Sequence, residues 1–205
     1  MTADLFADKE PGSCIKLELP DAEIYLYPGL FNEQEADQFF TDLKNEISWQ
    51  QEQITLYGQV HNLPRLTAWH GERDKSYTYS GIEVNSSPWT ATLLKIKDKI
   101  ENVSKINFNA VLLNLYRNGR DSVAWHADDE PELGKNPVIG SVTLGEARPF
   151  QMKHKINKQE KRTIILQHGS FLLMKGTTQH QWLHQIPKSK KQLGERINLT
   201  FRVVE

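Results

Sequence analysis

His126 and Asp128 stand two residues apart within the stretch 125–130. On a β-strand this spacing places both side chains on one face. An imidazole beside a carboxylate supplies two of the three ligands of a 2-His-1-carboxylate site, which holds non-haem Fe(II) and leaves coordination positions open. Because His-x-Asp pairs also occur by chance, the third ligand and a purpose for the metal must come from elsewhere in the chain.

Two later histidines, His180 and His184, are candidates for that third ligand. They stand four residues apart, which is an even number, so both rings face the same way on a strand. The spacing alone therefore leaves either histidine available to the metal.

The last stretch of the chain, residues 196–203, alternates strictly between polar and apolar residues. Its polar face holds Arg196, Asn198, Thr200 and Arg202. A surface edge strand would also alternate, but two guanidiniums with an amide and a hydroxyl between them suit a dicarboxylate, because arginine pairs with carboxylates through a planar fork. In the buried strand predicted over residues 108–116, Asn114 and Tyr116 share a face in the same way.

Two amphipathic helices are predicted to support these polar strands. Apolar residues recur at helical spacing over residues 33–47 and again over residues 88–103. Asn32 opens the first helix with a capping box, and Ser87, which precedes a proline, is the expected N-cap of the second. The helices should pack side by side, and neither carries residues expected to do chemistry.

From residue 108 onward the hydrophobic period is two, which is typical of strands. Together with a short strand over residues 24–27, strands are predicted over residues 108–116, 138–144, 149–153, 163–167, 170–175 and 196–203. The strands 138–144 and 149–153 are expected to form a hairpin turned at Gly145. Two helices followed by many short strands favour an α+β, mostly β fold: a double-stranded β-helix (jelly roll) backed by two N-terminal helices.

The chain has 205 residues, enough for a single domain over 1–205 with its jelly-roll core expected over 106–204. No apolar run approaches the length of a membrane span, and no secretory leader is expected. The one cysteine, Cys14, excludes an internal disulfide and suits a reducing compartment. We therefore expect a cytoplasmic protein, or a nuclear one in a eukaryote.

Charge is unevenly distributed along the chain. The net charge is −1, but residues 1–37 hold nine of the 26 acidic residues and only two of the 25 basic ones, which leaves +6 on residues 38–205. Residues 1–20 are expected to form a loosely ordered acidic arm. The basic remainder permits binding to a polyanion without requiring it.

The stretch 48–81 interleaves aromatic and basic residues on a chain broken by proline and glycine, and no hydrophobic period holds for long. Such a segment can stack bases and contact phosphate. Its aromatic residues can also simply fill core beneath a long loop, and the segment taken alone favours that second interpretation.

Several motifs, taken in order, resemble those of the AlkB family of Fe(II)/2-oxoglutarate dioxygenases. They are Asn114-x-Tyr116-x-x-Gly119, His126-x-Asp128-x-Glu130, His184 and Arg196-x-Asn198-x-Thr200-Phe201-Arg202. The resemblance covers about residues 60–203. It includes the segments 64–69 and 77–81, which are similar to the subgroup that repairs alkylated DNA and RNA. Residues 1–50 show little that is specific to the family.

The resemblance implies that His126, Asp128 and His184 hold Fe(II). It prefers His184 to His180 because the family's last ligand comes just before a short basic loop. The residues that it implies for binding 2-oxoglutarate are Asn114, Tyr116, Arg196, Asn198, Thr200 and Arg202.

Within that set, the resemblance gives the two arginines different carboxylates of 2-oxoglutarate. Arg196 would pair with the far carboxylate, helped by Tyr116 and Asn114. Arg202, with Asn198, would lie near the carboxylate that chelates the iron.

The resemblance also implies the reaction and the substrate. The chain would be an oxidative demethylase that removes N-alkyl lesions of the 1-methyladenine and 3-methylcytosine type from DNA and/or RNA, with O2 consumed, 2-oxoglutarate converted to succinate and CO2, and formaldehyde released. Residues 48–81 would be the nucleotide-recognition lid. The residues implied to contact the substrate are Trp69, Tyr77, Thr78, Tyr79, Asp129 and Glu130.

The partner would be nucleic acid, single-stranded DNA or RNA above all, with no membrane involved and the chain acting as a monomer. Two alternatives stay open. A 2-oxoglutarate oxygenase that acts on a protein or a small molecule would have the same iron and co-substrate residues. A non-enzymatic nucleic-acid binder would keep the fold, although the complete set of ligand-type residues argues against it.

Overall fold

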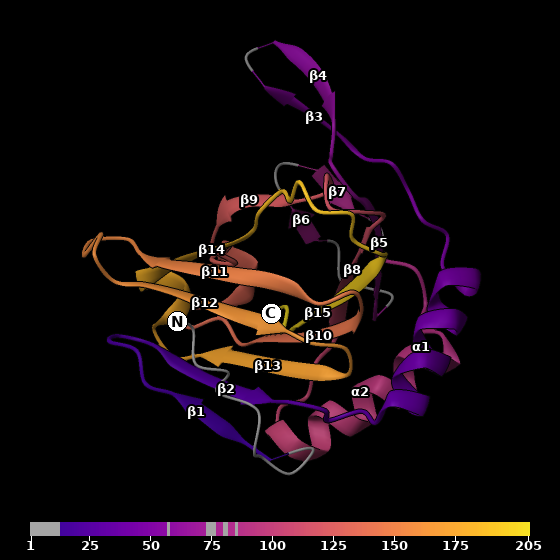
Figure 1. Cartoon of the computed structure of the whole chain (residues 1–205), viewed down its shortest axis with the longest axis horizontal. Coiled ribbons are helices and arrows are strands. Elements are labelled where there is room, and N and C mark those ends of the chain that lie inside the picture. Colours follow the sequence, from indigo (N-terminus) through magenta and orange to yellow (C-terminus); the bar gives the residue numbers. More distant parts are fainter. Residues whose placement is uncertain (1–12, 57, 73–76, 80–81, 85) are drawn as a thin grey trace.

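The computed structural model describes residues 13–56, 58–72, 77–79, 82–84 and 86–205, and two antiparallel sheets face each other in it (Figure 1). In sheet order, the larger sheet consists of β1 Ile15–Leu17, β2 Glu23–Tyr27, β13 Ser170–Lys175, β10 Ile139–Gly145, β15 Arg196–Arg202, β8 Ala110–Tyr116 and β5 Leu66–Gly71. The smaller sheet consists of β12 Lys161–Leu166, β11 Arg148–His154, β14 Trp182–Ile186 and β9 Val123–His126. The predicted mostly-β jelly roll is thereby confirmed.

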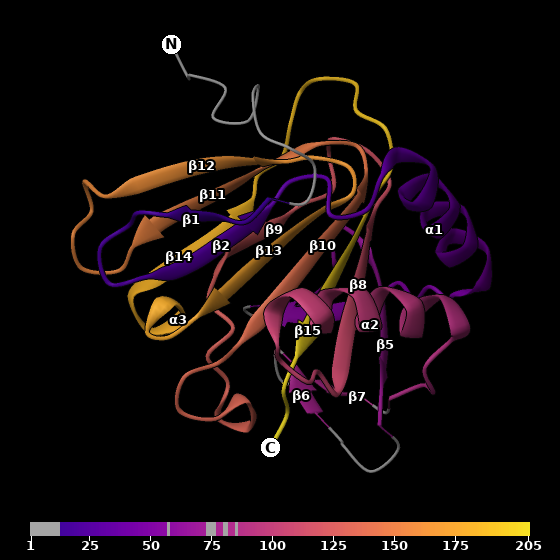
Figure 2. The same ribbon diagram turned by 90° about the horizontal axis from the view of Figure 1, so that it is seen from below.

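Two helices, α1 Glu33–Glu46 and α2 Ala91–Ser104, cover the outer face of the larger sheet (Figure 2). The predicted capping box of α1 is present: the Asn32 side chain accepts from the Glu35 N–H at 2.9 Å, and the Glu35 carboxylate accepts from the Asn32 N–H at 3.1 Å. Lys99 of α2 forms an ion pair with Glu35 at 2.9 Å, so the two helices contact each other as expected.

The second helix begins three residues later than the sequence indicates. Its N-cap is Thr90, whose hydroxyl accepts from the Leu93 N–H at 3.2 Å, and not Ser87. Ser87 instead forms a bridge with His70, and its N–H donates to the Trp69 carbonyl at 2.9 Å. Pairing with β5 therefore keeps the chain extended at Ser87.

Strands β15 and β8 pair next to the edge strand β5 in the larger sheet, and their alternation sorts side chains between two layers. Apolar residues such as Leu113 and Leu199 pack in the layer shared with the helices, whereas Asn114 and Asn198 face the space between the sheets. All seven residues of β15 are buried, so the polar face of this strand is an interior one.

The expected hairpin around Gly145 is wrong. β10 pairs with β13 and β15 in the larger sheet, whereas β11 pairs with β12 and β14 in the smaller one. The chain crosses between the sheets at Gly145, whose φ of 83° is a conformation that glycine adopts readily. β12 and β13 are divided in the same way, because consecutive strands of a jelly roll need not share a sheet.

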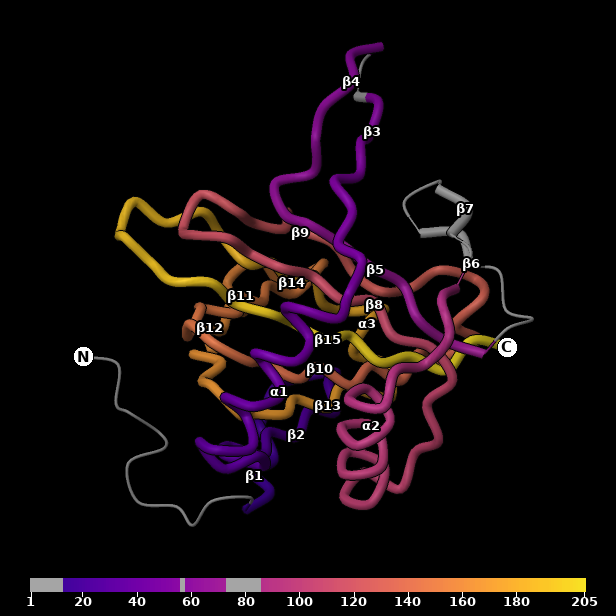
Figure 3. Tube along the Cα trace, turned by 90° about the vertical axis from the view of Figure 1, so that its right-hand side faces the viewer, coloured from indigo at the N-terminus to yellow at the C-terminus, as the bar shows by residue number. Residues whose placement is uncertain are grey.

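Part of the stretch 48–81 belongs to the larger sheet, and part of it lies outside the two main sheets. β3 Gln53–Leu56 and β4 Gln59–Asn62 form a hairpin that stands away from the sheets (Figure 3), whereas β5 is the edge strand of the larger sheet. A short pair, β6 Tyr77–Tyr79 and β7 Ile82–Val84, follows. The jelly-roll core therefore includes β5 as well as the strands within residues 106–204.

The N-terminal segment also contributes to the larger sheet. Within the predicted arm, β1 pairs with β2, so residues 15–17 are part of the sheet and not of a loose arm. Residues 1–12 lie outside the described residues. Among the helices that the structure describes, none is long and apolar enough to cross a membrane.

Candidate active site

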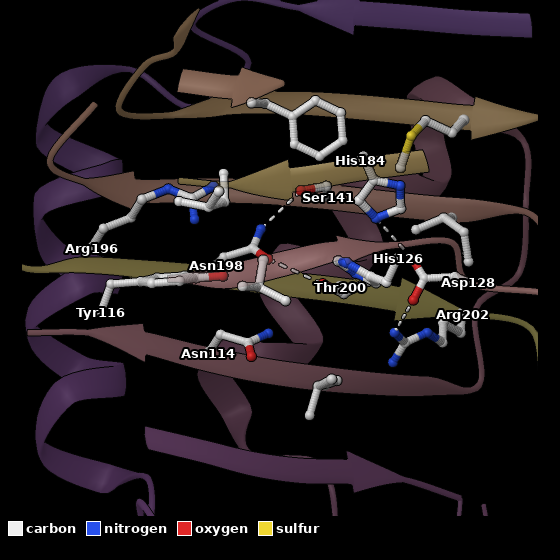
Figure 4. A pocket seen from close by; sticks show the side chains of 16 residues that line it. Asn114, Tyr116, His126, Asp128, Ser141, His184, Arg196, Asn198, Thr200 and Arg202 are labelled. Carbon is white, nitrogen blue, oxygen red and sulfur yellow. Dashed lines mark hydrogen bonds and ion pairs between the residues drawn. The ribbon is translucent and has the colours of Figure 1, made fainter. Parts of the chain in front are cut away.

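Three side chains from two distant parts of the chain meet between the sheets. His126 ends β9, Asp128 follows in the next loop, and His184 lies on β14 directly opposite His126. Their ligand atoms all lie within 4.8 Å of one another (Figure 4). His184 is therefore the third member of the predicted 2-His-1-carboxylate set. His180 lies in the short helix α3 Thr178–Gln181, where its Nε2 contacts the Lys135 carbonyl oxygen.

A hydrogen bond sets the tautomer of His126. His126 Nδ1 lies 2.8 Å from the Ala124 carbonyl oxygen, which can only accept, so Nδ1 carries the proton and Nε2 is left for a metal. Desolvation, with His184 close by, lowers the pKa of His126 to about 4, so the ring is neutral at pH 7. Neutral imidazole is the form that binds a metal ion.

Asp128 is held as an anion by Arg202. Burial acts to raise the Asp128 pKa, but the Arg202 guanidinium, together with His184, outweighs it and keeps the pKa well below its usual range. Arg202 Nη2 donates to Asp128 Oδ1 at 2.5 Å, and each side chain is 2% exposed. Arg202 thus contacts a metal ligand directly. The place near the iron-chelating carboxylate of 2-oxoglutarate, which the family resemblance implies for this arginine, stays a prediction.

Trp69, predicted to contact the substrate, is 4% exposed and is not among the residues that line the pocket. The Arg202 guanidinium lies over its ring, 5.7 Å from the ring centroid. Trp69 thus packs against Arg202, the arginine that contacts the metal ligand Asp128.

A second buried cation lies at the opposite end of the pocket from Arg202 (Figure 4). Arg196 is 1% exposed, its Nη2 donates to Thr143 Oγ1 at 2.9 Å, and its guanidinium lies 5.2 Å from the Tyr116 ring centroid. Burial lowers the Arg196 pKa to about 10, so the group stays cationic at pH 7. Among the described residues its Nε and Nη1 have no hydrogen-bond partner. Two guanidinium nitrogens that are buried and without a partner fit a carboxylate.

The floor between metal ligands and Arg196 is polar. Asn198 Nδ2 donates to Ser141 Oγ at 2.8 Å, and Thr200 Oγ1 donates to Asn198 Oδ1 at 3.1 Å. Asn114 Oδ1 accepts from Arg65 Nε at 2.7 Å, which turns the amide nitrogen of Asn114 away from Arg65. The predicted co-substrate residues therefore line one pocket, with about 470 Å³ of space including its open mouth.

Sequence reasoning missed several of the residues that support this pocket. Arg65, one of the basic residues in the stretch 48–81 that could contact phosphate, is 4% exposed and donates a hydrogen bond to Asn114. Ser141 and Thr143 contact the polar face of β15, and their period-two spacing is the signal that could have indicated them. Arg148 is fully buried and donates to three main-chain carbonyls of the loops beside the pocket.

Asp129 and Glu130, two of the predicted substrate residues, are not among the residues that line the pocket. Asp129 is exposed and forms an ion pair with Lys155 at 2.9 Å, and Glu130 lies at the start of the turn η1 Pro131–Leu133. The side chains of Tyr77, Thr78 and Tyr79 lie outside the described residues, and only their backbone in β6 is placed. Their contact with a base stays a prediction.

Comparison with known proteins agrees with this geometry. The profile of the 2OG-Fe(II) oxygenase superfamily matches residues 23–202. The chain is 36% identical over 188 residues to DNA oxidative demethylase ALKBH2 of Homo sapiens, over 87% of this chain and 72% of that protein. The chain belongs to the AlkB family. It is also 41% identical over 192 residues to alpha-ketoglutarate-dependent dioxygenase alkB homolog 3 of Bos taurus.

That second match covers 89% of this AlkB-family chain and 66% of the bovine relative, so the chain spans slightly less than two thirds of its length. The solved structure of OsALKBH1 matches with a TM-score of 0.63 at 19% identity, over 93% of this chain and 100% of the other. This likeness supports the jelly-roll fold.

The donor set of the AlkB-family chain fits Fe(II) and 2-oxoglutarate. Two imidazoles and one carboxylate converge on a single point, and two guanidinium nitrogens of Arg196 have no partner among the described residues at the other end of the pocket. A 2-oxo-acid with a second carboxylate matches both ends.

We expect His184→Ala to lose bound metal, whereas His180→Ala should keep it. The two histidines were equivalent by spacing, but only His184 lies with His126 and Asp128. Equilibrium dialysis with Mn(II), a redox-stable stand-in for Fe(II), measures the difference. Loss of binding in both variants, with both folded by circular dichroism, would contradict the assignment of His184 alone.

Proposed function

We propose that this chain is an oxidative demethylase that removes N-alkyl groups from bases in DNA and/or RNA, at the expense of O2 and 2-oxoglutarate. The observation that carries the proposal is the match to DNA oxidative demethylase ALKBH2 across a chain that has the three metal-binding side chains and the buried Arg196. Within that activity, we propose lesions of the 1-methyladenine and 3-methylcytosine type as substrates.

The chain's own groups would bind and orient the reactants. Bound Fe(II), 2-oxoglutarate and O2 supply the oxidation: the oxo-acid becomes succinate and CO2, and one oxygen atom hydroxylates the N-methyl carbon, which leaves as formaldehyde. Arg196 binds the far carboxylate, and its depth in the pocket sets how far the oxo-acid reaches toward the metal ligands. Phe150 stacks on the His184 ring at 5.1 Å between centroids and so fixes its orientation.

A basic groove beside the site supports nucleic acid as the substrate. Residues 118–120 of one loop and residues 188–193 of another line it together and contribute Arg120, Lys188, Lys190 and Lys191. None of these four forms an ion pair within the part of the chain that the structure describes, so their charge is available to a polyanion. The first loop follows the strand that carries Tyr116, and the second precedes Arg196, so bound phosphate would lie near the catalytic strands.

Further features of the proposal concern the form of the substrate and the setting. We propose single-stranded DNA or RNA as the preferred substrate, because a base must leave its stack to enter a pocket of this depth, which costs least where no partner strand holds it. We also propose that the chain acts as a monomer in the cytoplasm, or in the nucleus of a eukaryote. Residues 48–81 would act as the lid over the base.

The test is demethylation of defined oligonucleotides. Purified chain with Fe(II), ascorbate and 2-oxoglutarate is expected to remove methyl groups from oligonucleotides that carry 1-methyladenine or 3-methylcytosine, with one succinate formed per methyl group. Mass spectrometry should compare DNA with RNA and single with double strands. Binding should weaken steeply as salt rises.

Two results would contradict the proposal, each in its own way. Succinate formation without loss of methyl from any oligonucleotide would favour an oxygenase that acts on a protein or small molecule. Salt-dependent oligonucleotide binding without any succinate would favour a binding protein that has kept the fold.

A further inference from the structure

Gln179 is a fully buried polar residue to which the proposed reaction gives no role. It lies in α3, the short helix that connects β13 to β14, five residues before the metal ligand His184. A buried amide requires hydrogen-bond partners, so its contacts show what it stabilises.

The Gln179 side chain contacts the main chain of one metal ligand and a residue that lines the pocket. Oε1 accepts from the main-chain N–H of Asp128 at 3.1 Å, a contact between residues 51 apart in the chain. Nε2 lies 3.7 Å from Sδ of Met174, which lines the pocket. The orientation of the amide is determined, because a main-chain N–H can only donate and so requires the oxygen.

This hydrogen bond replaces one that the sheet cannot provide. β9 ends at His126, so Asp128 lies in a loop where no neighbouring strand accepts its N–H. Asp128 is therefore held at two points: Arg202 fixes the carboxylate, and Gln179 fixes the main chain that carries it. The direction of the carboxylate toward the two histidines depends on both.

The helix that carries Gln179 is itself anchored. Thr178 Oγ1 accepts from the Glu23 N–H at 2.9 Å and donates to the Lys175 carbonyl at 2.6 Å. Lys155 Nζ donates to the Gln179 carbonyl at 2.9 Å and forms the ion pair with Asp129, the residue after the metal ligand. α3 is thus tied to β2, to β13 and to the loop of Asp128.

We propose that Gln179 is a positioning residue for the metal centre, which holds the Asp128 loop in register with the strand that carries His184. The inference rests on the proposed function in so far as that function requires a metal at His126, Asp128 and His184. Partners of metal ligands in other proteins typically contribute about 10- to 100-fold to metal affinity or activity.

The test compares Gln179→Met with Gln181→Met. Methionine keeps the length of the side chain and removes the acceptor. Gln181 is in the same helix, and its side chain makes no hydrogen bond within the described residues. We expect Gln179→Met to bind Mn(II) about 10- to 100-fold more weakly than the wild type, and Gln181→Met to bind within about twofold of it. Gln179→Glu, which keeps an acceptor oxygen at the same reach, should retain more affinity than Gln179→Met.

A second measurement needs no variant to fold. Amide hydrogen exchange of the metal-free wild type should show the Asp128 N–H protected although it lies in a loop, and rapid exchange there would overturn the inference. Equal Mn(II) affinity of the wild type and folded Gln179→Met would overturn the positioning role of Gln179 and leave the proposed function intact. A wild-type chain that binds no Mn(II) would overturn the proposed function together with this inference.

Discussion

Replacing Asp128 by alanine is expected to abolish both metal retention and 2-oxoglutarate turnover. Asp128 is the one carboxylate among the three ligands and is 2% exposed, so no mobile surface group can take its place. Its loss also removes the negative charge that balances the divalent ion. Mn(II) dialysis and succinate formation measure the two losses. Wild-type turnover in Asp128→Ala would contradict the metal assignment.

The same substitution should destabilise the metal-free fold. Asp128 and Arg202 form a buried ion pair, and removing one partner of such a pair typically costs about 3–5 kcal/mol, because the other charge stays buried. Urea unfolding in the presence of a chelator measures the difference in unfolding free energy. The neighbouring Asp129→Ala is the matched control, since its pair with Lys155 is exposed and such pairs contribute about 0–1 kcal/mol.

The pH dependence of this difference has a definite sign. Folding depresses the pKa of Asp128, so its stabilisation is fully present above the unfolded value of about 3.9. This stabilisation is lost as the pH falls through the lower pKa that Asp128 has in the folded state. The gap in unfolding free energy between wild type and Asp128→Ala should thus be constant near pH 7 and shrink below about pH 4. A gap that widens in acid would contradict the anionic state of Asp128.

The residues on the polar face of β15 could be predicted because one strand contains the whole pattern. The alternation from Arg196 to Arg202 determines which side chains share a face, and the structure adds only that this face is interior. The third metal ligand could not be predicted from spacing, because the even spacing of His180 and His184 makes them equivalent on a strand. The family resemblance separated them, and the structure gives the physical reason: β14 begins after His180, so only His184 lies on the strand that pairs with β9.

The strand pairing and the contacts of Gln179 and Arg65 could not be predicted from the sequence, because they depend on residues far away along the chain. A period of two predicts a strand but not the sheet that it joins, so β10 and β11 were paired wrongly. Gln179 meets Asp128 across 51 residues, and nothing near Gln179 distinguishes it from Gln181. Arginine is a residue type that often binds phosphate, and only the fold shows that the Arg65 guanidinium is buried against Asn114.

Arg196→Met is expected to weaken binding of 2-oxoglutarate far more than it weakens binding of the metal. Arg196 is 1% exposed, and two of its guanidinium nitrogens, Nε and Nη1, have no hydrogen-bond partner among the described residues. Losing one partner of a buried, hydrogen-bonded charge pair costs about 2–5 kcal/mol, which is about 30-fold to several thousand-fold in affinity. The affinity of Arg196→Lys for 2-oxoglutarate should lie between those of the wild type and Arg196→Met, because an ammonium keeps the charge but not the planar fork. Anaerobic titration of the Mn(II)-loaded chain measures the affinity.

A second oxo-acid separates the role of Arg196 from general damage to the pocket. 2-Oxopentanoate has a methyl group where 2-oxoglutarate has its far carboxylate, so it offers the guanidinium nothing to bind. The wild type should strongly prefer 2-oxoglutarate, and Arg196→Met should lose that preference while binding 2-oxopentanoate at least as well as the wild type does. If the variant instead lost affinity for both acids equally, Arg196 would support the pocket walls, and the far carboxylate would have to be bound by another cation.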